Sequence, residues 1–293
     1  MGNVASMSTN FPAECVNQVF SAVKGKSSLA TLCDQIPVAF TGSDLFVFNL
    51  DQEIALVGEN QAKSHGGLSL APVKVVPVKI EYGARVSDEF LYATEEKKLE
   101  ILKAFNDGFA KKAARGLDIM AMHGVNPRTG EASDLIKYYF DKGSNTVEYD
   151  AAACDGNVED AIAMIGDYDV TGIAMAKTFS GAMAKLEGAN GGKKYPELAW
   201  GGQPKAVNGV PASVNSTVSF GDSDDMAIVG DFANCFKWGY AKQVPMEVIP
   251  YGDPDNTGKD LKGHNQVYIR AEAYIGWAIL DEKAFARVIK QGA

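Results

Sequence analysis

The amino-acid sequence predicts an α+β fold in which extended segments precede one long helix and a mixed block of short elements follows it. Three observations predict this class. A proline-free amphipathic run covers residues 94–122, two strand-like runs at residues 44–50 and 73–86 precede it, and short apolar strands alternate with helices from residue 157 onward. The later connections are too short for a helical crossover between every pair of strands, so antiparallel pairing is expected among them.

The first 43 residues carry little charge and are interrupted by Pro12 and Pro37, with one short helix expected at residues 12–23. We expect this segment to be an arm that packs on another surface.

The two strand-like runs predict a long projecting hairpin. A polar, glycine-containing stretch at residues 57–72 separates them, and Pro77 marks the second run as an edge or bulged strand. A two-stranded hairpin is marginal in water by itself. The hairpin is therefore expected to need a partner surface.

The run at residues 94–122 predicts a helix about 40 Å long, at about 1.5 Å per residue. Glu95 and Glu96 lie in its first turn, where negative charge suits the helix dipole. Its apolar residues recur at helical spacing, at Leu99, Leu102, Phe105, Phe109, Ala113, Leu117 and Met120.

Composition excludes several classes of function. The 293 residues contain 28 Lys and Arg against 37 Asp and Glu, a formal charge of -9, and they contain no basic stripe for reading nucleic acid. The N-terminus lacks the features of a secretory signal, and no stretch of eighteen apolar residues predicts a membrane span. Four widely spaced cysteines are expected to be reduced and mostly buried, namely Cys15, Cys33, Cys154 and Cys235.

No catalytic or nucleotide-binding motif is present. The sequence has no nucleophile elbow, Walker A loop or dinucleotide fingerprint, and residues 188–196 predict a turn and not a phosphate loop. The histidines His65, His123 and His264 stand in glycine-rich contexts that favour solvated or capping roles. We therefore expect neither an enzyme nor a cofactor or metal site.

The acidic segment at residues 252–260 has some features of a calcium-binding loop. It lacks the bidentate Glu at the twelfth position, because His264 stands there if Asp253 opens the loop. A polar turn is the favoured interpretation.

The collinear order of these parts resembles the major capsid proteins of tailed bacteriophages, which have the HK97-type fold. Residues 45–75 resemble the extended E-loop of that family, and residues 78–93 with the long helix resemble its peripheral strand and spine helix. Residues 172–186, 208–214 and 228–248 resemble the axial domain, and residues 267–288 resemble the last peripheral strand.

The resemblance implies four regions. They are an N-terminal arm at 1–43, an E-loop hairpin at 44–80, a peripheral domain with the spine helix at 81–150 and 266–293, and an axial domain at 151–265. It also implies that the chain self-assembles, as hexamers and pentamers, into an icosahedral phage head enclosing double-stranded DNA. The partners would be other copies, a scaffold protein or portal during assembly, and DNA through weak non-specific contacts. No membrane partner is expected; the location would be the virion, assembled in the host bacterial cytoplasm.

Subunit contacts are expected at the hairpin tip and on the outward face of the long helix. The candidate residues are Glu59, Lys63, His65, Lys97, Lys111 and Arg115. The alternative for each is a solvated surface charge.

The resemblance also implies candidate residues for an isopeptide cross-link between subunits. Lys63 would be joined to Asn265, with assistance from Glu272. A desolvated carboxylate could take a proton from the lysine, which would then attack the carboxamide and expel ammonia. The favoured alternative is that Glu272 simply pairs with Arg270 or another arginine.

Two other functional classes remain open from sequence. The first is an encapsulin-like cellular nanocompartment with the same fold, which packages protein cargo instead of DNA. The second is an enzyme whose site has no familiar motif.

Overall fold

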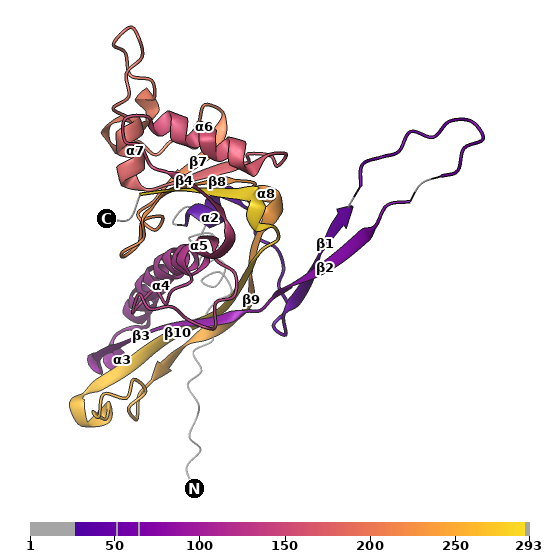
Figure 1. The fold of residues 1–293 in the computed structure, drawn as a ribbon. Coiled ribbons are helices and arrows are strands. Elements are labelled where there is room, and N and C mark those ends of the chain that lie inside the picture. The colour runs from indigo at the N-terminus through magenta and orange to yellow at the C-terminus, as the bar shows by residue number, and fades with distance from the viewer. Residues whose placement is uncertain (1–26, 51, 64, 291–293) are drawn as a thin grey trace.

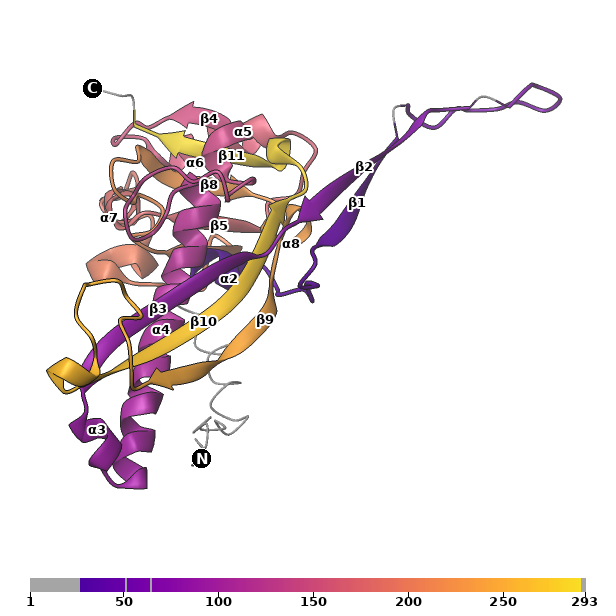
Figure 2. The same ribbon diagram turned by 90° about the horizontal axis from the view of Figure 1, so that it is seen from below.

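The computed structural model describes residues 27–50, 52–63 and 65–290 (Figure 1). It has three parts: a projecting hairpin, a three-stranded sheet with a long helix along it, and a six-stranded sheet with further helices (Figures 1 and 2). The helix expected at residues 12–23, and Cys15, lie outside the described residues.

The hairpin consists of β1 (Ser43–Leu50) and β2 (Leu68–Val75), paired antiparallel with Ser43 opposite Val75. It extends well away from the rest of the molecule (Figures 1 and 2). The single strand expected at residues 73–86 is wrong. The chain leaves one sheet at Val75 and enters another at Val78, because Pro77 has no N–H to continue a ladder.

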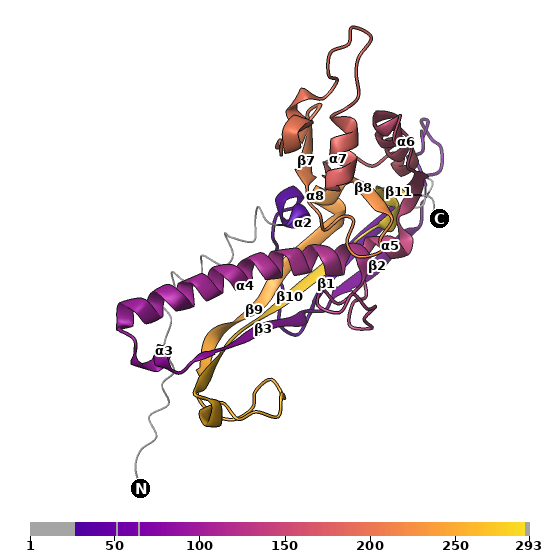
Figure 3. The same cartoon turned by 90° about the vertical axis from the view of Figure 1, so that its left-hand side faces the viewer.

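The three-stranded sheet has the order β3-β10-β9, and all its pairings are antiparallel. Its strands are β3 (Val78–Ser87), β9 (Phe236–Ile249) and β10 (Gln266–Ile279). The long helix α4 (Glu95–His123) lies along this sheet (Figure 3). The short helix α3 (Glu89–Tyr92) connects β3 to it.

Both ends of α4 are capped by residues suited to these positions. The Thr94 side chain accepts a hydrogen bond from the Lys97 N–H, and Gly124 adopts a left-handed conformation with φ of 68°. Burial is uneven along the helix. Leu99 is 47% exposed, whereas Ile119 is 1% exposed. The C-terminal half therefore lies in the core between the two sheets, and the N-terminal half extends beyond it (Figure 3).

The six-stranded sheet has the order β4-β11-β8-β5-β7-β6. Its antiparallel pairs match the expectation, and it also has two parallel pairs, β4 with β11 and β5 with β7. The strand bounds are Asn145–Glu148 (β4), Gly172–Met175 (β5), Ala206–Val207 (β6), Val210–Val214 (β7), Asp225–Gly230 (β8) and Phe285–Ile289 (β11).

Short helices surround this sheet: α2 (Ser28–Leu32), α5 (Phe140–Gly143), α6 (Cys154–Ile165), α7 (Lys177–Met183) and α8 (Phe232–Cys235). Figures 1 and 3 show α6 and α7 on the side away from α4. α2 lies within the segment expected as an arm, yet Leu29 and Ala30 are fully buried in the core. At least this part of the arm belongs to the body of the same subunit.

The strand pairing crosses the expected boundary between the peripheral and axial regions at two places. β11, expected in the peripheral domain, pairs with β8 of the expected axial domain, and β10, also expected in the peripheral domain, pairs with β9 of the expected axial domain. β4 and β11, both expected in the peripheral domain, pair with each other in the six-stranded sheet. Cys33 and Cys154 are buried, as expected. Among the described residues, no helix combines the length and apolar character needed to cross a membrane.

Candidate functional site

The tip of the hairpin exposes apolar side chains to solvent. Ile54 and Leu56 are 99% and 102% exposed, and Val57 is also exposed. A Gly58 carbonyl accepts a hydrogen bond from the Gln61 N–H and closes a turn nearby. Exposed aliphatic residues clustered on a projecting segment are typical of a surface that another molecule covers.

The predicted tip residues Glu59, Lys63 and His65 are also exposed in this segment. Their placement at the tip agrees with the sequence analysis. Whether they contact a neighbour stays a prediction.

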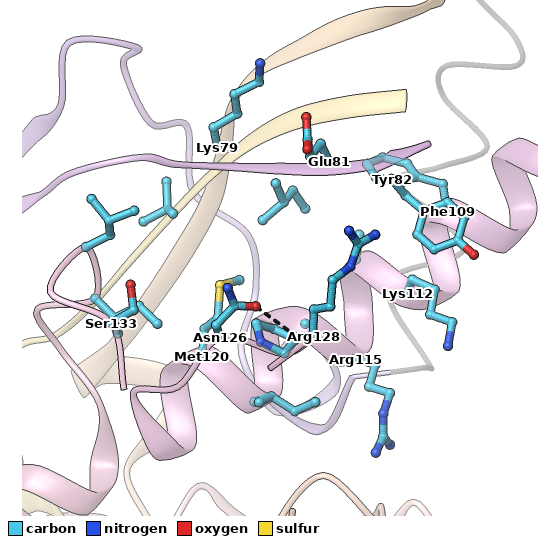
Figure 4. Close-up of a pocket in the computed structure, with 18 residues that line it drawn as sticks. Lys79, Glu81, Tyr82, Phe109, Lys112, Arg115, Met120, Asn126, Arg128 and Ser133 are labelled. Carbon is cyan, nitrogen blue, oxygen red and sulfur yellow. Dashed lines mark hydrogen bonds between the residues drawn. The ribbon is translucent and has the colours of Figure 1, made fainter. Parts of the chain in front are cut away.

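A groove of about 430 Å³ lies between β3, the middle of α4 and the loop at residues 126–136 (Figure 4). Its lining includes the apolar residues Val78, Ile80, Phe109, Ile119 and Ile136. This is the size of a cleft that can receive several side chains.

The charged residues of this groove are mostly basic. Lys79, Lys112, Arg115 and Arg128 line it together with one acidic residue, Glu81 (Figure 4). An acidic or mixed apolar and acidic segment would complement this surface.

The three helix charges predicted from sequence have different surroundings. The ammonium of Lys97 lies 2.8 Å from Glu100 one turn along the exposed face, and Lys111 is exposed. Arg115 donates to the Ser216 hydroxyl at 3.0 Å and stacks over Phe220, 5.5 Å from the ring centre. Arg115 therefore already has partners within its own subunit.

The three residues of the cross-link hypothesis do not meet within one subunit. Lys63 lies on the hairpin, and Asn265 and Glu272 are seven residues apart along extended chain, about 23 Å at about 3.3 Å per residue. The Glu272 carboxylate lies 2.8 Å from Lys79 and 3.4 Å from Arg270. A cross-link would need groups from several subunits and would have to disrupt these ion pairs.

A buried ion network joins the C-terminal end of α4 to the six-stranded sheet. His123 Nδ1 lies 3.0 Å from Asp141 and its Nε2 lies 2.9 Å from the Thr217 carbonyl oxygen. Arg287 donates to Asp141 at 2.9 Å and to Asp225 at 2.8 Å. The carbonyl can only accept, so Nε2 must carry a proton, and Nδ1 needs a second one to bond a carboxylate. The geometry therefore favours the imidazolium form of His123.

Electrostatics agree with this protonation state. Burial opposes the charged imidazole, but the hydrogen bond and charge of Asp141 raise the pKa of His123 above its usual value. Burial and the adjacent Asp141 raise the pKa of Asp225 to about 7. Burial also acts on Asp141, but its hydrogen bonds to His123 and Asp225 and the charges of His123 and Arg287 together outweigh burial and lower the pKa of Asp141.

His123, Asp141 and Asp225 offer ligand atoms within 4.8 Å of one another, as a metal site would. Arg287 already supplies positive charge to both carboxylates, so we interpret the group as an ion network. The sequence interpretation of His123 as a loop residue is wrong. It lies in the last turn of α4 and is 8% exposed.

A comparison with protein-family models finds a match to the phage capsid family over residues 11–289. The chain belongs to the phage capsid family. A match of nearly the whole chain assigns this capsid protein a structural role, and the predicted HK97-type fold is confirmed.

Solved structures from two phages and of a GTA particle capsid are similar to this capsid protein over most of their length. A structure from Mycobacterium phage Ogopogo is 30% identical, with a TM-score of 0.76 and coverage of 92% of this chain and 93% of that one. One from Gordonia phage Cozz is 23% identical, with a TM-score of 0.74 and coverage of 91% and 87%. A capsid of a native GTA particle is 17% identical, with a TM-score of 0.65 and coverage of 92% and 91%. A search of curated proteins finds no match.

Proposed function

We propose that this major capsid protein assembles with copies of itself, as hexamers and pentamers, into an icosahedral shell that encloses double-stranded DNA. The observation that carries the proposal is the hairpin, which extends from the body and exposes Ile54 and Leu56 almost completely. A subunit with a projecting segment and a separate receiving surface makes heterologous contacts, and these close into rings and shells when the rotation permits.

The groove beside β3 is the surface that we propose receives the hairpin tip of a neighbour. The tip places Ile54, Leu56 and Val57 between Glu53 and Glu59. The groove has an apolar lining and a basic majority among its charged residues. Apolar burial would supply affinity, and the complementary charges would set the register.

The remaining partners follow from charge and family. A net charge of -9 favours weak, non-specific contact with packaged DNA, which lets the DNA move during packaging and ejection. We propose that a scaffold protein or portal takes part in assembly. We further propose that assembly takes place in the cytoplasm of the bacterial host and that the protein ends in the virion.

Deletion of residues 59–67 tests the proposed role of the hairpin. We expect a folded subunit that forms no stable shells, because the deletion removes Glu59, Lys63 and His65 and shortens the segment that presents Leu56 and Val57, while the described residues among those deleted are all exposed. Normal shells from the deletion variant would show that the hairpin is dispensable.

A point variant with a matched control tests whether the apolar side chain of Leu56 is needed for assembly. Leu56→Asp should abolish shells or sharply reduce their yield, because it places a carboxylate at an apolar contact. Gln61→Asp adds the same charge to the same exposed tip and should assemble much more nearly like the parent. Equal assembly of both variants would contradict the apolar contact.

A further inference from the structure

The loop between β9 and β10 wraps around the side chain of Arg85. The loop covers residues 250–265 and stands at the end of the three-stranded sheet far from the hairpin (Figures 1 and 2). Arg85 belongs to β3, where it is paired with Tyr268 of β10, and its side chain is 15% exposed. The sheet thus directs a guanidinium into the loop.

One nitrogen of Arg85, Nη2, has four oxygen atoms close around it. It lies 2.6 Å from Asp253 Oδ1, 2.5 Å from Asp255 Oδ1, 2.6 Å from the Thr257 hydroxyl and 2.9 Å from the Lys259 carbonyl oxygen. A guanidinium nitrogen of this kind carries only two hydrogens, so four directional hydrogen bonds are impossible. The arrangement is an oxygen cage around a positive centre.

The spacing of these oxygens is that of a calcium-binding loop. If Asp253 is position 1, the ligands fall at positions 1, 3, 5 and 7, and the last is a backbone carbonyl, as in an EF-hand. Gly258 stands at position 6 with φ of 77°, where such loops require glycine. The twelfth position is His264, which offers no bidentate carboxylate.

We propose that Arg85 is the resident cation of a calcium-type loop, and that this loop keeps its shape without a divalent ion. The remaining donors of Arg85 support the assignment. Nε donates to Asp255 Oδ2 at 2.9 Å and Nη1 donates to Gln266 at 3.2 Å, so all three nitrogens of the guanidinium are engaged.

Hydrogen bonds within the loop also hold the Asp253 carboxylate in position. Asp253 accepts hydrogen bonds from the backbone N–H groups of Thr257 and Gly258, at 3.0 Å and 2.6 Å. The Arg85 hydrogen bond lowers the pKa of Asp255 to about 2, so this carboxylate stays ionised at neutral pH. Removing the guanidinium leaves these oxygens facing one another, and a divalent ion would then relieve the repulsion.

Calcium titration of the full chain tests the assignment directly. Arg85→Ala should bind one Ca²⁺ per subunit by calorimetry, with a dissociation constant of about 10⁻³–10⁻⁴ M, and the parent should bind at least about tenfold more weakly. The double variant Arg85→Ala with Asp255→Asn should lose the site. Calcium binding by the parent as tight as by Arg85→Ala would overturn the proposal.

Hydrogen exchange at the Gly258 amide provides a second readout. In the parent its protection should be unchanged by Ca²⁺ or by a chelator. In Arg85→Ala it should fall and then recover with Ca²⁺. If Arg85→Ala does not fold, Asp255→Asn in the parent background should reduce protection at Gly258 and leave amides of β8 unchanged. Full protection at Gly258 without the guanidinium, or in Asp255→Asn, would contradict the role of Arg85.

Discussion

Asp118, in the middle of the core, accepts a hydrogen bond of 2.8 Å from the backbone N–H of Ser28, 90 residues earlier in the chain. The same carboxylate accepts bonds from the Ser27 hydroxyl, the Leu29 N–H and the Thr217 hydroxyl. Asp118 is fully buried. It therefore holds together the start of α2, the long helix and the segment that leads into β8.

Replacing Asp118 with Asn should destabilise the subunit strongly. Each carboxylate oxygen accepts from more than one donor, so an amide NH₂ at either position would face donors that it cannot satisfy. We expect a loss of about 3 kcal/mol in the free energy of unfolding of unassembled subunits, measured with urea. Glu100→Gln on the exposed face is the control, expected within about 0.5 kcal/mol of the parent. An equal effect of both variants would show that the Asp118 network is not stabilising.

Subunit stability should fall as pH rises from about 4 to above 7. Asp225 has a pKa of about 7 in the folded state against its ordinary value of 3.8, burial also raises the pKa of Asp118, and the pKa of His123 is raised above 6.5. In this window the folded state holds more protons than the unfolded state, so raising the pH favours unfolding. Asp141, whose pKa is lowered in the folded state, makes subunit stability rise with pH, but only below its ordinary pKa of 3.8.

Asp225→Asn should flatten this pH dependence. Asn keeps an acceptor for Arg287 and cannot ionise, so the Asp225 part of the slope disappears and the slope from His123 and Asp118 remains. Melting temperatures of the parent and the variant between pH 5 and 8 measure the difference. Parallel curves for the two proteins would contradict the assignment of the slope to Asp225.

Gly124→Ala should destabilise the junction after α4. Its φ of 68° disfavours any side chain, and an added Cβ would lie 2.8 Å from the ring of Tyr139. Gly130 has a similar φ of 76° but open space around it, so Gly130→Ala isolates the backbone cost of about 1 kcal/mol. Gly124→Ala should lower the melting temperature clearly more. Equal shifts would mean that the Tyr139 contact relaxes without cost.

Subunits in assembled shells should remain separate chains. The Glu272 carboxylate is engaged by Lys79 and Arg270, so it is poorly placed to accept a proton from Lys63. Denaturing gel electrophoresis of shells should give one band near 31.3 kDa. A ladder that disappears in Lys63→Arg would instead establish the cross-link.

Much of the fold could be predicted because it depends on local periodicity. The long helix was predicted within one residue at each end, since Thr94 and Gly124 mark its limits. The hairpin followed from two extended runs around a polar segment. The strand-like pattern alone ran the second run together across Pro77, whereas the family resemblance separated residues 45–75 from residues 78–93, and β2 and β3 do lie in different sheets.

The polar sites could not be predicted, because their parts are far apart in the chain. His123, Asp141 and Asp225 meet Arg287 only after β8 and β11 pair, so no sequence spacing relates them. The acidic loop was recognised as resembling a calcium loop, but its cation comes from Arg85, some 170 residues earlier in the chain. Only the register between β3 and β10 brings them together.

Electron microscopy of the purified full-length protein tests the central claim most directly. The account predicts closed shells built from this subunit, formed by the protein alone or when a scaffold protein is co-expressed. Subunits that stay monomeric under every condition, with and without the scaffold, would contradict it.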